Sequence, residues 1–340
     1  MIYCVIVTYG QRKALLYATL QAALGAGIER AVVVDNGSHW DVTRDVEADF
    51  GTRVDVVRLQ RNCGSAPGFK AGMARALRLG AEHLLILDDD LGVNQETIDQ
   101  LQRTLQSLAT NQELSKCAVC AYRKSAMERM IRIEGHRLVH EVAPNILRFS
   151  SARIFKTIFL AASKYLQRHG PGNESGVALS GTVPVAFAPY GGVFIHRSAV
   201  ESIGLPDERF ALYWDDIEWT YRITDRGGSI VIDCDAPLDE LEISHPFRKW
   251  RVSRFHSLLL REAGPADYRV YYEIRNAVYF AARPARHDVA WLGLRLAAFR
   301  IGVDVLGLIL KRTRRARAIR IAIADGRSGR LGYNNDFPLE

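Results

Sequence analysis

Three consecutive aspartates follow directly on the apolar run Leu84–Leu87, at positions Asp88, Asp89 and Asp90. Adjacent carboxylates repel one another and desolvate poorly, so they need a counter-charge at the edge of a core. A hard divalent cation, which prefers oxygen ligands, supplies such a charge. Because side chains alternate along an extended segment, Asp88 and Asp90 face one side and Asp89 the other. The pattern predicts a metal site at Asp88 and Asp90; the alternative is a polar turn in which Asp90 or Asn94 caps the next helix.

A second acidic cluster lies in the segment Trp214–Trp219, where Asp215 and Asp216 are adjacent and Glu218 follows. Neighbouring carboxylates raise the apparent pKa of the pair, which suits an acid that must accept a proton. The alternative is structural, because acids in the first turn stabilise a helix that begins near residue 217. The two roles are compatible, so helix capping does not exclude a chemical role for this cluster.

Strand-like and helix-like segments alternate through the first 90 residues. The predicted buried strands are Ile2–Tyr9, Ala31–Val34, Val54–Leu59 and Leu84–Leu87, with a helix up to about Gly25 and another over Phe69–Leu79. This alternation predicts a parallel, doubly wound α/β sheet. Ligands of such sheets bind beyond the carboxyl ends of the strands. The residues expected at that edge are Thr8, Asp35, the Gly64–Gly68 loop and Asp88–Asp90.

Two of these edge features have alternatives. The Gly64–Gly68 loop precedes a helix, and its backbone N–H groups suit a phosphate. It matches neither the Walker A pattern nor GxGxxG. Asp35 follows a strand, where an acid accepts hydrogen bonds from a ribose or a base, but an Asx turn explains the same residue equally well.

The composition is that of a globular protein with an uneven charge. The chain has 340 residues, 48% of them hydrophobic, and a net charge of +7. The basic excess is concentrated in residues 311–330, which indicates a basic tail against a phosphate-rich surface rather than a nucleic-acid binder.

The cysteines predict a reducing, cytoplasmic environment. There are five, an odd number, scattered along the chain, and the apolar run Ile2–Val7 is too short for a secretory signal. Cys117 and Cys120 form a lone CxxC within a strand-like run, so we expect core positions rather than a zinc site.

Taken in order, these motifs resemble those of inverting family 2 glycosyltransferases of the GT-A fold, and most closely the bacterial galactofuranosyltransferases, with rhamnosyltransferases next. The resemblance covers residues 2 to about 250 and rests on Val5–Tyr9, Val33–Ser38, Asn62–Gly64, Leu87–Asp90, Tyr190–Ile195, Ile203–Phe210 and Trp214–Trp219. It implies an α/β fold of the GT-A type, with a Rossmann-like, mostly parallel sheet flanked by helices. It also implies a catalytic domain over residues 1–250, with a nucleotide-binding half (1–90) and an acceptor and catalytic half (186–250), followed by a helical, basic region over 251–340.

The resemblance implies roles for individual residues. Asp88 and Asp90 match the acids that hold Mn²⁺ or Mg²⁺ on the donor diphosphate, and His245 matches a third ligand, with a structural histidine as the alternative. Asp216 matches the general base. The positions matched to donor binding are Thr8, Asp35, Lys70, Asp89, Gly191, Gly192, Trp214 and Asp215. Gly191 and Gly192 equally fit a bulge in a strand over Tyr190–His196.

The implied reaction moves a sugar, galactofuranose from UDP-galactofuranose, to a hydroxyl of a cell-envelope or lipid-linked glycan. Rhamnosyl transfer from dTDP-rhamnose is the alternative within the family. Outside it, a sugar nucleotidyltransferase also pairs such a sheet with metal-binding acids, but Thr8–Arg12 poorly supplies the Gly-rich, basic loop that it needs. A non-catalytic basic binder leaves both acidic clusters unexplained.

The C-terminal part has the pattern of a membrane-surface region. Val289–Leu310 is apolar but contains Arg295, Arg300 and Asp304, too many charges for a spanning helix. Its predicted apolar face, next to the basic run Lys311–Arg317, fits an interfacial helix on an anionic inner leaflet. That face comprises Leu296, Phe299, Val303 and Leu306. A helical lid or an oligomer contact is the alternative, and the amphipathic stretch 148–176 is a second candidate for acceptor or membrane contact.

Overall fold

The computed structural model of the chain describes residues 1–124, 127, 180–242, 266–282 and 289–339. It divides into two compact units, one of residues 1–140, 179–245 and 332–340 and the other of residues 141–178 and 246–331. The predicted boundary at residue 250 and the stretch 148–176 lie outside the described residues, as does His245.

In the described part of the first unit, eight strands form one sheet in the order β3-β2-β1-β4-β8-β6-β9-β7. Strands β3, β2, β1 and β4 are mutually parallel, as are β6 and β9, whereas β8 is antiparallel to both β4 and β6. The strands are β1 (Ile2–Gly10), β2 (Arg30–Ser38), β3 (Val54–Leu59), β4 (His83–Asp88), β6 (Cys117–Tyr122), β7 (Thr182–Val185), β8 (Val193–His196) and β9 (Ser229–Pro237). The predicted fold class, a mostly parallel α/β sheet flanked by helices, is confirmed.

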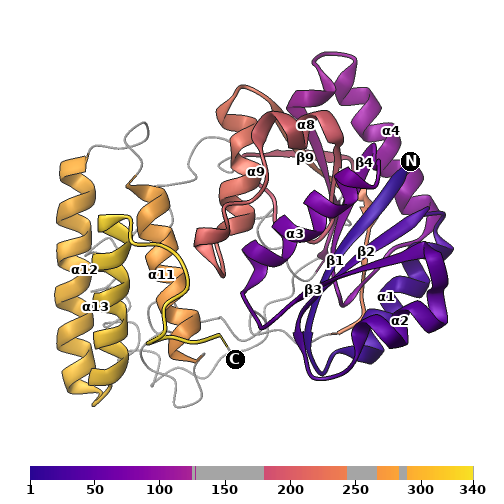
Figure 1. The fold of residues 1–340 in the computed structure, drawn as a ribbon. Coiled ribbons are helices and arrows are strands. Elements are labelled where there is room, and N and C mark those ends of the chain that lie inside the picture. The colour runs from indigo at the N-terminus through magenta and orange to yellow at the C-terminus, as the bar shows by residue number, and fades with distance from the viewer. Residues whose placement is uncertain (125–126, 128–179, 243–265, 283–288, 340) are drawn as a thin grey trace, which may run out of the picture. The chain divides into compact units, whose positions relative to one another are not determined.

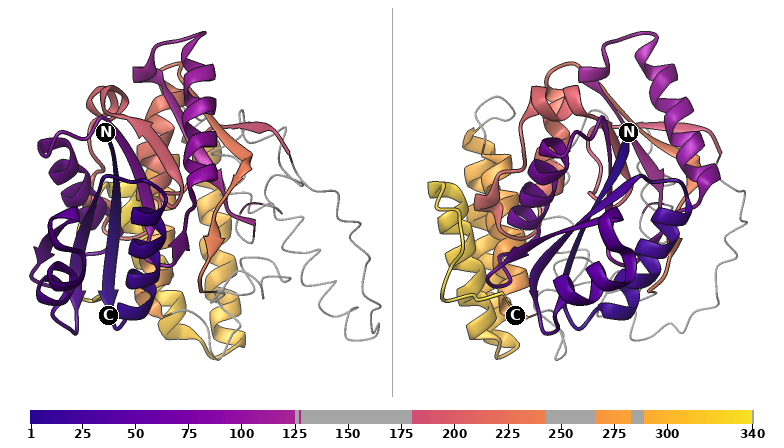
Figure 2. Two further views of the ribbon diagram at one scale, coloured as in Figure 1. Left: turned by 90° about the vertical axis from the view of Figure 1, so that its right-hand side faces the viewer. Right: turned by 45° about the vertical axis from the view of Figure 1, so that its right-hand side comes forward.

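Helices cover both faces of this sheet (Figures 1 and 2). One face packs on α1 (Lys13–Gly25), α2 (Val42–Phe50) and α4 (Gln95–Ala109), and the other on α3 (Ser65–Arg78), α8 (Arg197–Ile203) and α9 (Asp215–Asp225). Along β1, Tyr3 and Val5 join one core and Cys4 and Ile6 the other. Burial on both faces explains why this strand is apolar at every position rather than alternating. The described part of this unit also contains three 3₁₀ turns, η1 (Gly51–Arg53), η2 (Leu114–Lys116) and η3 (Glu208–Phe210).

The predicted Gly64–Gly68 loop is wrong, because helix α3 begins at Ser65. Only Gly64 lies outside the helix, with φ of +94°, a backbone conformation that favours glycine. Pro67 is tolerated in the first helical turn, where the missing N–H has no intrahelical partner to lose. Cys117 and Cys120 are buried in β6, the core position that the sequence predicted for them.

A short two-stranded sheet closes one edge of the unit. Strand β5 (Leu91–Gly92) directly follows the three aspartates and pairs antiparallel with β10 (Asp239–Glu240). Residues 332–339 also belong to this unit: the Gly332 amide donates to the Arg209 carbonyl at 2.6 Å, and the Arg61 guanidinium lies 4.6 Å from the centre of the Tyr333 ring.

The second unit contains α11 (Asp267–Ala281), α12 (Val289–Ile309) and α13 (Thr313–Ser328). Helices α11 and α13 are joined by a hydrogen bond from Tyr271 to Asp325 of 2.8 Å and by an ion pair between Arg315 and Asp267 of 2.6 Å. None of the described helices has the length and hydropathy of a membrane-crossing segment.

The prediction of which face of α12 is exposed to a membrane surface is wrong. Leu296, Phe299 and Val303 are buried within the helical unit, and Leu306 is partly buried. A helix that is apolar on nearly every side buries one face and leaves another open. The large apolar side chains that α12 exposes are Leu294, Ile301, Val305, Leu308 and Ile309.

Candidate active site

The carboxyl ends of three parallel strands bring the predicted edge residues together. Val7 is in register with Asp88 on β4, and Thr8 is in register with Asp35 on β2. Side chains separated by up to 80 residues in the sequence therefore meet at one edge of the sheet, where ligands of such sheets bind.

Asp89 is the buried member of the acidic triplet, at 4% exposure. Its carboxylate accepts hydrogen bonds from the Thr8 hydroxyl at 2.7 Å and from Arg12 Nε at 2.8 Å. Burial raises the pKa of Asp89 to about 6, and Arg12 and Thr8 limit the rise. Thr8 is also fully buried, so Thr8 and Asp89 both lie beneath the surface at this edge of the sheet. Their contact with the donor stays a prediction.

Asp88 and Asp90 are more exposed than Asp89. Asp88 Oδ2 accepts a hydrogen bond from Arg123 Nη1 at 2.9 Å, and Asp90 Oδ2 accepts one from Arg12 Nη2 at 3.1 Å. Burial, followed by the charge of Asp88, raises the pKa of Asp90. Asp90 Oδ1 is buried without a hydrogen-bond partner in the described part of the chain. A buried, unpaired carboxylate oxygen beside a second carboxylate is an arrangement that fits an oxygen-coordinated cation.

The second acidic cluster follows a strained loop. Ala211, Tyr213 and Trp214 all have positive φ, between 60° and 68°, although none is glycine. Backbone of this kind costs energy and gathers at functional sites. It ends where α9 begins, so the strained loop sets the positions of Asp215 and Asp216 at the start of the helix. The Ile217 amide donates to Asp216 Oδ1 at 2.7 Å, so the predicted structural role in the first helical turn is present as well.

Asp216 lies close enough to the acidic triplet to feel its charge. Burial raises the pKa of Asp216 to about 6; the Ile217 amide opposes the rise, and the negative charge of Asp88 adds to it. The charge of Arg123 also reaches Asp216. Two clusters that are far apart in the sequence therefore share one electrostatic environment.

Asp215 is more deeply buried than Asp216, at 2% exposure. Burial and the neighbouring Asp216 charge raise the pKa of Asp215 to about 8. Asp215 Oδ2 and the Tyr190 hydroxyl are both buried without a hydrogen-bond partner among the described residues. Burial raises the pKa of Tyr190 well above its usual value, and the charge of Asp215 adds to the rise. Ser65 and Tyr190 lie close enough to Asp215 to lower its pKa, against the larger effect of burial.

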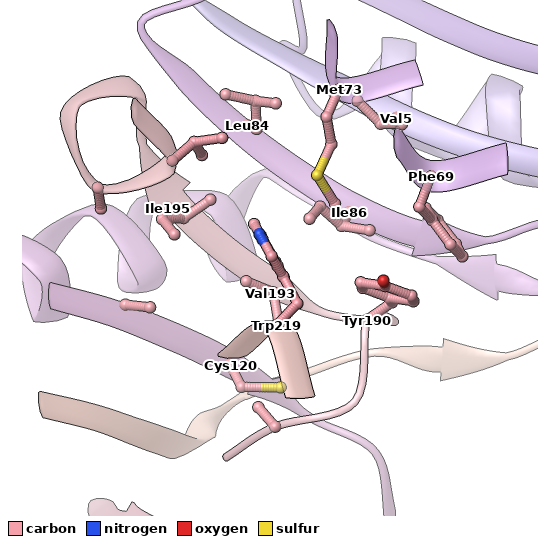
Figure 3. Close-up of a cluster of buried hydrophobic side chains, with 14 of the residues drawn as sticks. Val5, Phe69, Met73, Leu84, Ile86, Cys120, Tyr190, Val193, Ile195 and Trp219 are labelled. Carbon is pink, nitrogen blue, oxygen red and sulfur yellow. The ribbon is translucent and has the colours of Figure 1, made fainter. Parts of the chain in front are cut away.

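The ring of Tyr190 anchors this cluster to the core. Its centroid lies 4.3 Å from that of Phe69 on α3 and 5.9 Å from that of Trp219 on α9 (Figure 3). Trp219 is fully buried and its indole N–H donates to the Gly204 carbonyl at 2.8 Å, so Trp219 has a core role.

Gly191 lies beside Asp88, and Gly192 lies beside Ala121 of β6. A Cβ atom at Gly191 would stand 2.6 Å from Asp88 Oδ2 and 2.7 Å from Arg123 Nη1. Gly192 has φ of +107°. Glycine at 191 thus leaves room for the Asp88–Arg123 pair, and glycine at 192 permits the backbone turn into β8.

The side chain of Asp35 accepts a backbone hydrogen bond of the kind expected for an Asx turn. Asp35 Oδ1 accepts the Ser38 amide at 2.8 Å, and Arg58 Nε lies 3.8 Å from Oδ2. The next residue, Asn36, donates to the Gly64 carbonyl at 3.0 Å and so fixes the start of α3. A contact of Asp35 with a nucleotide base stays a prediction.

Two other predicted donor residues have partners within the protein. Lys70, on α3, lies 3.1 Å from Glu208 of η3. Trp214 is buried, at 5% exposure, so its ring has little surface for stacking on a sugar. The described residues contain no group of three or more His, Cys, Asp or Glu side chains arranged to hold a metal ion.

Two arginines of this site were missed from the sequence. Arg12 follows β1 and Arg123 follows β6, so both lie just beyond the carboxyl ends of strands. The rule that functional residues follow the carboxyl ends of the strands also applies to Arg12 and Arg123. The three aspartates at that edge need positive counter-charges, which was a second signal for these arginines.

With this geometry in place, residues 3–166 match the family model described as Glycosyl transferase family 2. This part of the chain, just under half of its length, belongs to glycosyl transferase family 2. The predicted family is thereby confirmed, and the edge of the sheet carrying Asp88–Asp90 is the candidate active site of this glycosyltransferase.

Two curated relatives of this glycosyltransferase are similar over much of the chain. Galactofuranosyltransferase GlfT1 of Mycolicibacterium smegmatis is 24% identical over 228 residues, which cover 66% of this chain. Low-salt glycan biosynthesis hexosyltransferase Agl10 of Haloferax volcanii is 25% identical over 258 residues, 74% of this chain. The chain matches 66% of the length of each relative, just under two thirds.

Solved structures with a similar fold include S. aureus TarS 1–349 in complex with UDP, at 13% identity and a TM-score of 0.47, over 99% of this chain and 98% of that one. GalNAc-T7 with UDP, GalNAc and Mn²⁺ has 12% identity and a TM-score of 0.48, over 82% of this chain and 47% of that one.

Proposed function

We propose that this glycosyltransferase moves a hexose with inversion from a nucleotide-sugar to a hydroxyl of a glycan acceptor, with Asp216 as the general base. The observation that carries the proposal is that the charge of Asp88 raises the pKa of Asp216, although the two residues lie 128 positions apart in the sequence. An inverting transfer needs a base at the acceptor and a stabilised leaving diphosphate at the same centre.

Asp216 is suited to the role of base. It is partly exposed, whereas its neighbour Asp215 is buried, so the acceptor hydroxyl reaches Asp216 first. Its pKa of about 6 leaves the carboxylate ionised at neutral pH and more basic than an ordinary aspartate. Asp216 takes the proton of the attacking hydroxyl as the new bond to the anomeric carbon forms. Asp215, whose pKa burial raises to about 8, keeps its proton at neutral pH.

Asp88 and Asp90 are the proposed ligands of Mn²⁺ or Mg²⁺. The unpaired oxygen of Asp90 and the nearby charge of Asp88 support this assignment. A divalent cation held there would supply positive charge to a departing diphosphate. The proposed third ligand, His245, follows the last described residue of its segment, Glu242, by three positions. Glu242 lies 2.8 Å from Arg12, which also contacts Asp90.

We propose UDP-galactofuranose as the donor, on the support of the relative named for that sugar. Rhamnose from dTDP-rhamnose is the alternative within the family. Purified enzyme is incubated with each donor in turn, and release of the free nucleoside diphosphate is measured. Faster turnover of UDP-galactofuranose is the expected result. Preference for dTDP-rhamnose would overturn the choice of sugar but not the reaction, whereas release of pyrophosphate would indicate a nucleotidyltransferase.

We further propose that the acceptor is a cell-envelope or lipid-linked glycan, reached from the inner face of the plasma membrane. The support is on α12, where Leu294, Ile301, Val305 and Leu308 recur at helical spacing and are each about half exposed or more. Exposed basic side chains stand on the same helix and just after it, at Arg300, Lys311, Arg314 and Arg317. An exposed apolar stripe next to basic residues fits an anionic lipid surface.

A further inference from the structure

The segment Asp239–Glu242 runs alongside the acidic edge. Glu240 is in register with Leu91, and the Leu241 amide donates to the Asp90 carbonyl at 2.9 Å. The segment therefore lies antiparallel to the residues that follow the aspartates, and its own acids, Glu240 and Glu242, come close to the edge.

Arg12 bridges this segment to the aspartates through all three nitrogens of its guanidinium. Nε donates to Asp89 at 2.8 Å, Nη2 donates to Asp90 Oδ2 at 3.1 Å, and Nη1 donates to Glu242 Oε2 at 2.8 Å. The Arg12 side chain is 19% exposed. A planar guanidinium fixes the directions of its hydrogen bonds, as an ammonium group does not.

Arg123 makes the corresponding contact on the other side. Its Nη1 donates to Asp88 Oδ2 at 2.9 Å, and its Nε lies 4.0 Å from Glu240 Oε1. Gly191 is packed against this pair so closely that a Cβ atom there would collide with both partners. The Asp88–Arg123 pair thus has a fixed place in the site.

The two arginine contacts leave Asp88 and Asp90 with the same pattern of hydrogen bonds. In Asp88 and in Asp90 an arginine holds Oδ2, and no hydrogen bond within the described residues engages Oδ1. A carboxylate held by one oxygen presents the other in a defined direction, which is how groups behind metal ligands orient them.

We propose that Arg12 and Arg123 are positioning residues of the cation site, which orient Asp90 and Asp88 so that one oxygen of each is presented to the metal. The inference rests on the proposed metal dependence of Asp88 and Asp90. It gives the arginines a role opposite to that expected from charge alone, because two cations near a metal site would otherwise weaken the binding of the metal.

Orientation of the aspartates and repulsion of the metal by positive charge predict opposite changes in Mn²⁺ affinity, so a binding measurement distinguishes them. Free Mn²⁺ is measured by electron paramagnetic resonance while wild type, Arg12→Gln, Arg12→Lys and Arg123→Lys are titrated with MnCl₂. Positioning predicts that each variant binds Mn²⁺ about tenfold or more weakly, including the two lysine variants, which keep the charge. Unchanged affinity in the lysine variants, or tighter binding in Arg12→Gln, would overturn the proposal and assign the arginines to charge balance alone.

Two further variants keep the test decisive. Arg44→Gln removes an exposed arginine that pairs with Asp45 on α2, and its Mn²⁺ affinity is expected to equal that of wild type. Glu242→Gln weakens the far end of the Arg12 bridge without touching an aspartate, and we expect a fall of a few-fold; an unchanged affinity there would remove the bridge from the proposal. If Arg12 variants unfold, as judged by their melting curves, the Glu242 and Arg123 variants decide the question. If wild type itself fails to bind Mn²⁺, the proposed metal dependence fails, and the inference with it.

Discussion

Asp216 is placed so that burial and the charge of Asp88 both raise its pKa, to about 6. Because this pKa is raised, protonation of the base begins at a higher pH than for an ordinary aspartate, whose value is 3.8. Its neighbour Asp215 is more buried and binds its proton more tightly. The two adjacent carboxyls therefore differ in protonation at neutral pH, which is how one pair of acids divides two roles.

A pH profile checks this assignment. We expect kcat/KM for the acceptor to be level near neutral pH and to fall about tenfold per pH unit below about pH 6, because the protonated base cannot accept the hydroxyl proton. The rate is measured at saturating donor and Mn²⁺ from about pH 4.5 to about pH 8. A profile that stays level down to pH 4.5 would contradict a base with a raised pKa, whereas the melting temperature over the same range serves as the control for unfolding.

At the scale of elements, the start of α3 and the loop before α9 hold each other in place. The Ala66 amide donates to the Ala211 carbonyl at 3.1 Å, and Gly64 is packed against that same carbonyl. Residues 332–339 close the contact from a third direction, since Leu339 lies against Gly64 and Gly332 bonds to Arg209. The strained residues that lead into Asp215 are thus supported by a segment from the far end of the described chain.

Gly64→Ala tests this contact, with Gly51→Ala as the matched control. Both glycines have positive φ, so both variants carry a backbone cost of about 1 kcal/mol. A Cβ at Gly64 would lie 2.2 Å from the Ala211 oxygen, whereas a Cβ at Gly51 would meet nothing within 4 Å. We expect Gly64→Ala to lose about 1–3 kcal/mol more stability than the control in urea unfolding, and to lower kcat as well. Equal losses in the two variants would mean that the 211–214 loop adapts freely.

The sequence predicted most of these elements and the residues at their ends, because strand ends are set by local apolar runs. The span of β3 and the acids after β4 were read directly from such runs. The first turn of α3 was missed, since glycine and proline mark loops more often than helix starts. Arg12 and Arg123 were missed because their partners come from strands that pair only in the folded chain. The strained backbone at Ala211–Trp214 has no local signal, since none of its residues with positive φ is glycine.

At the scale of the whole molecule, α12 is the clearest case in which composition was right and orientation was wrong. Leu296, Phe299 and Val303 belong to the apolar face that the sequence analysis assigned to a membrane surface. In the structure all three are buried. Helix α12 has apolar residues on two sides, so periodicity alone does not say which side faces the protein. The exposed stripe that includes Ile301 and Leu308 is therefore the candidate membrane-contacting surface of α12.

Vesicle binding tests that surface. We expect the double variant Ile301→Ser, Leu308→Ser to bind vesicles rich in anionic phospholipid about tenfold or more weakly than wild type, because it loses two exposed apolar anchors. Ala297→Ser, on the same helix, is the control with little apolar loss. Wild-type binding is also expected to fall with added salt. Equal binding by all three proteins would exclude the stripe as a membrane contact, and a shift of the double variant to a smaller size in gel filtration would assign it to a second copy of the chain.

The division of labour between Asp216 and the Asp88–Asp90 edge is tested most directly by Asp216→Asn, in which donor affinity and turnover are measured on the same preparation. The account predicts that kcat falls by about a thousandfold or more while the dissociation constant of the nucleotide-sugar stays within about threefold, because the base acts on the acceptor hydroxyl and the aspartates hold the donor. Asp225→Asn, at the exposed end of the same helix, is expected to match wild type in both. A large fall in donor affinity with little change in kcat would contradict the account and move Asp216 into the donor site.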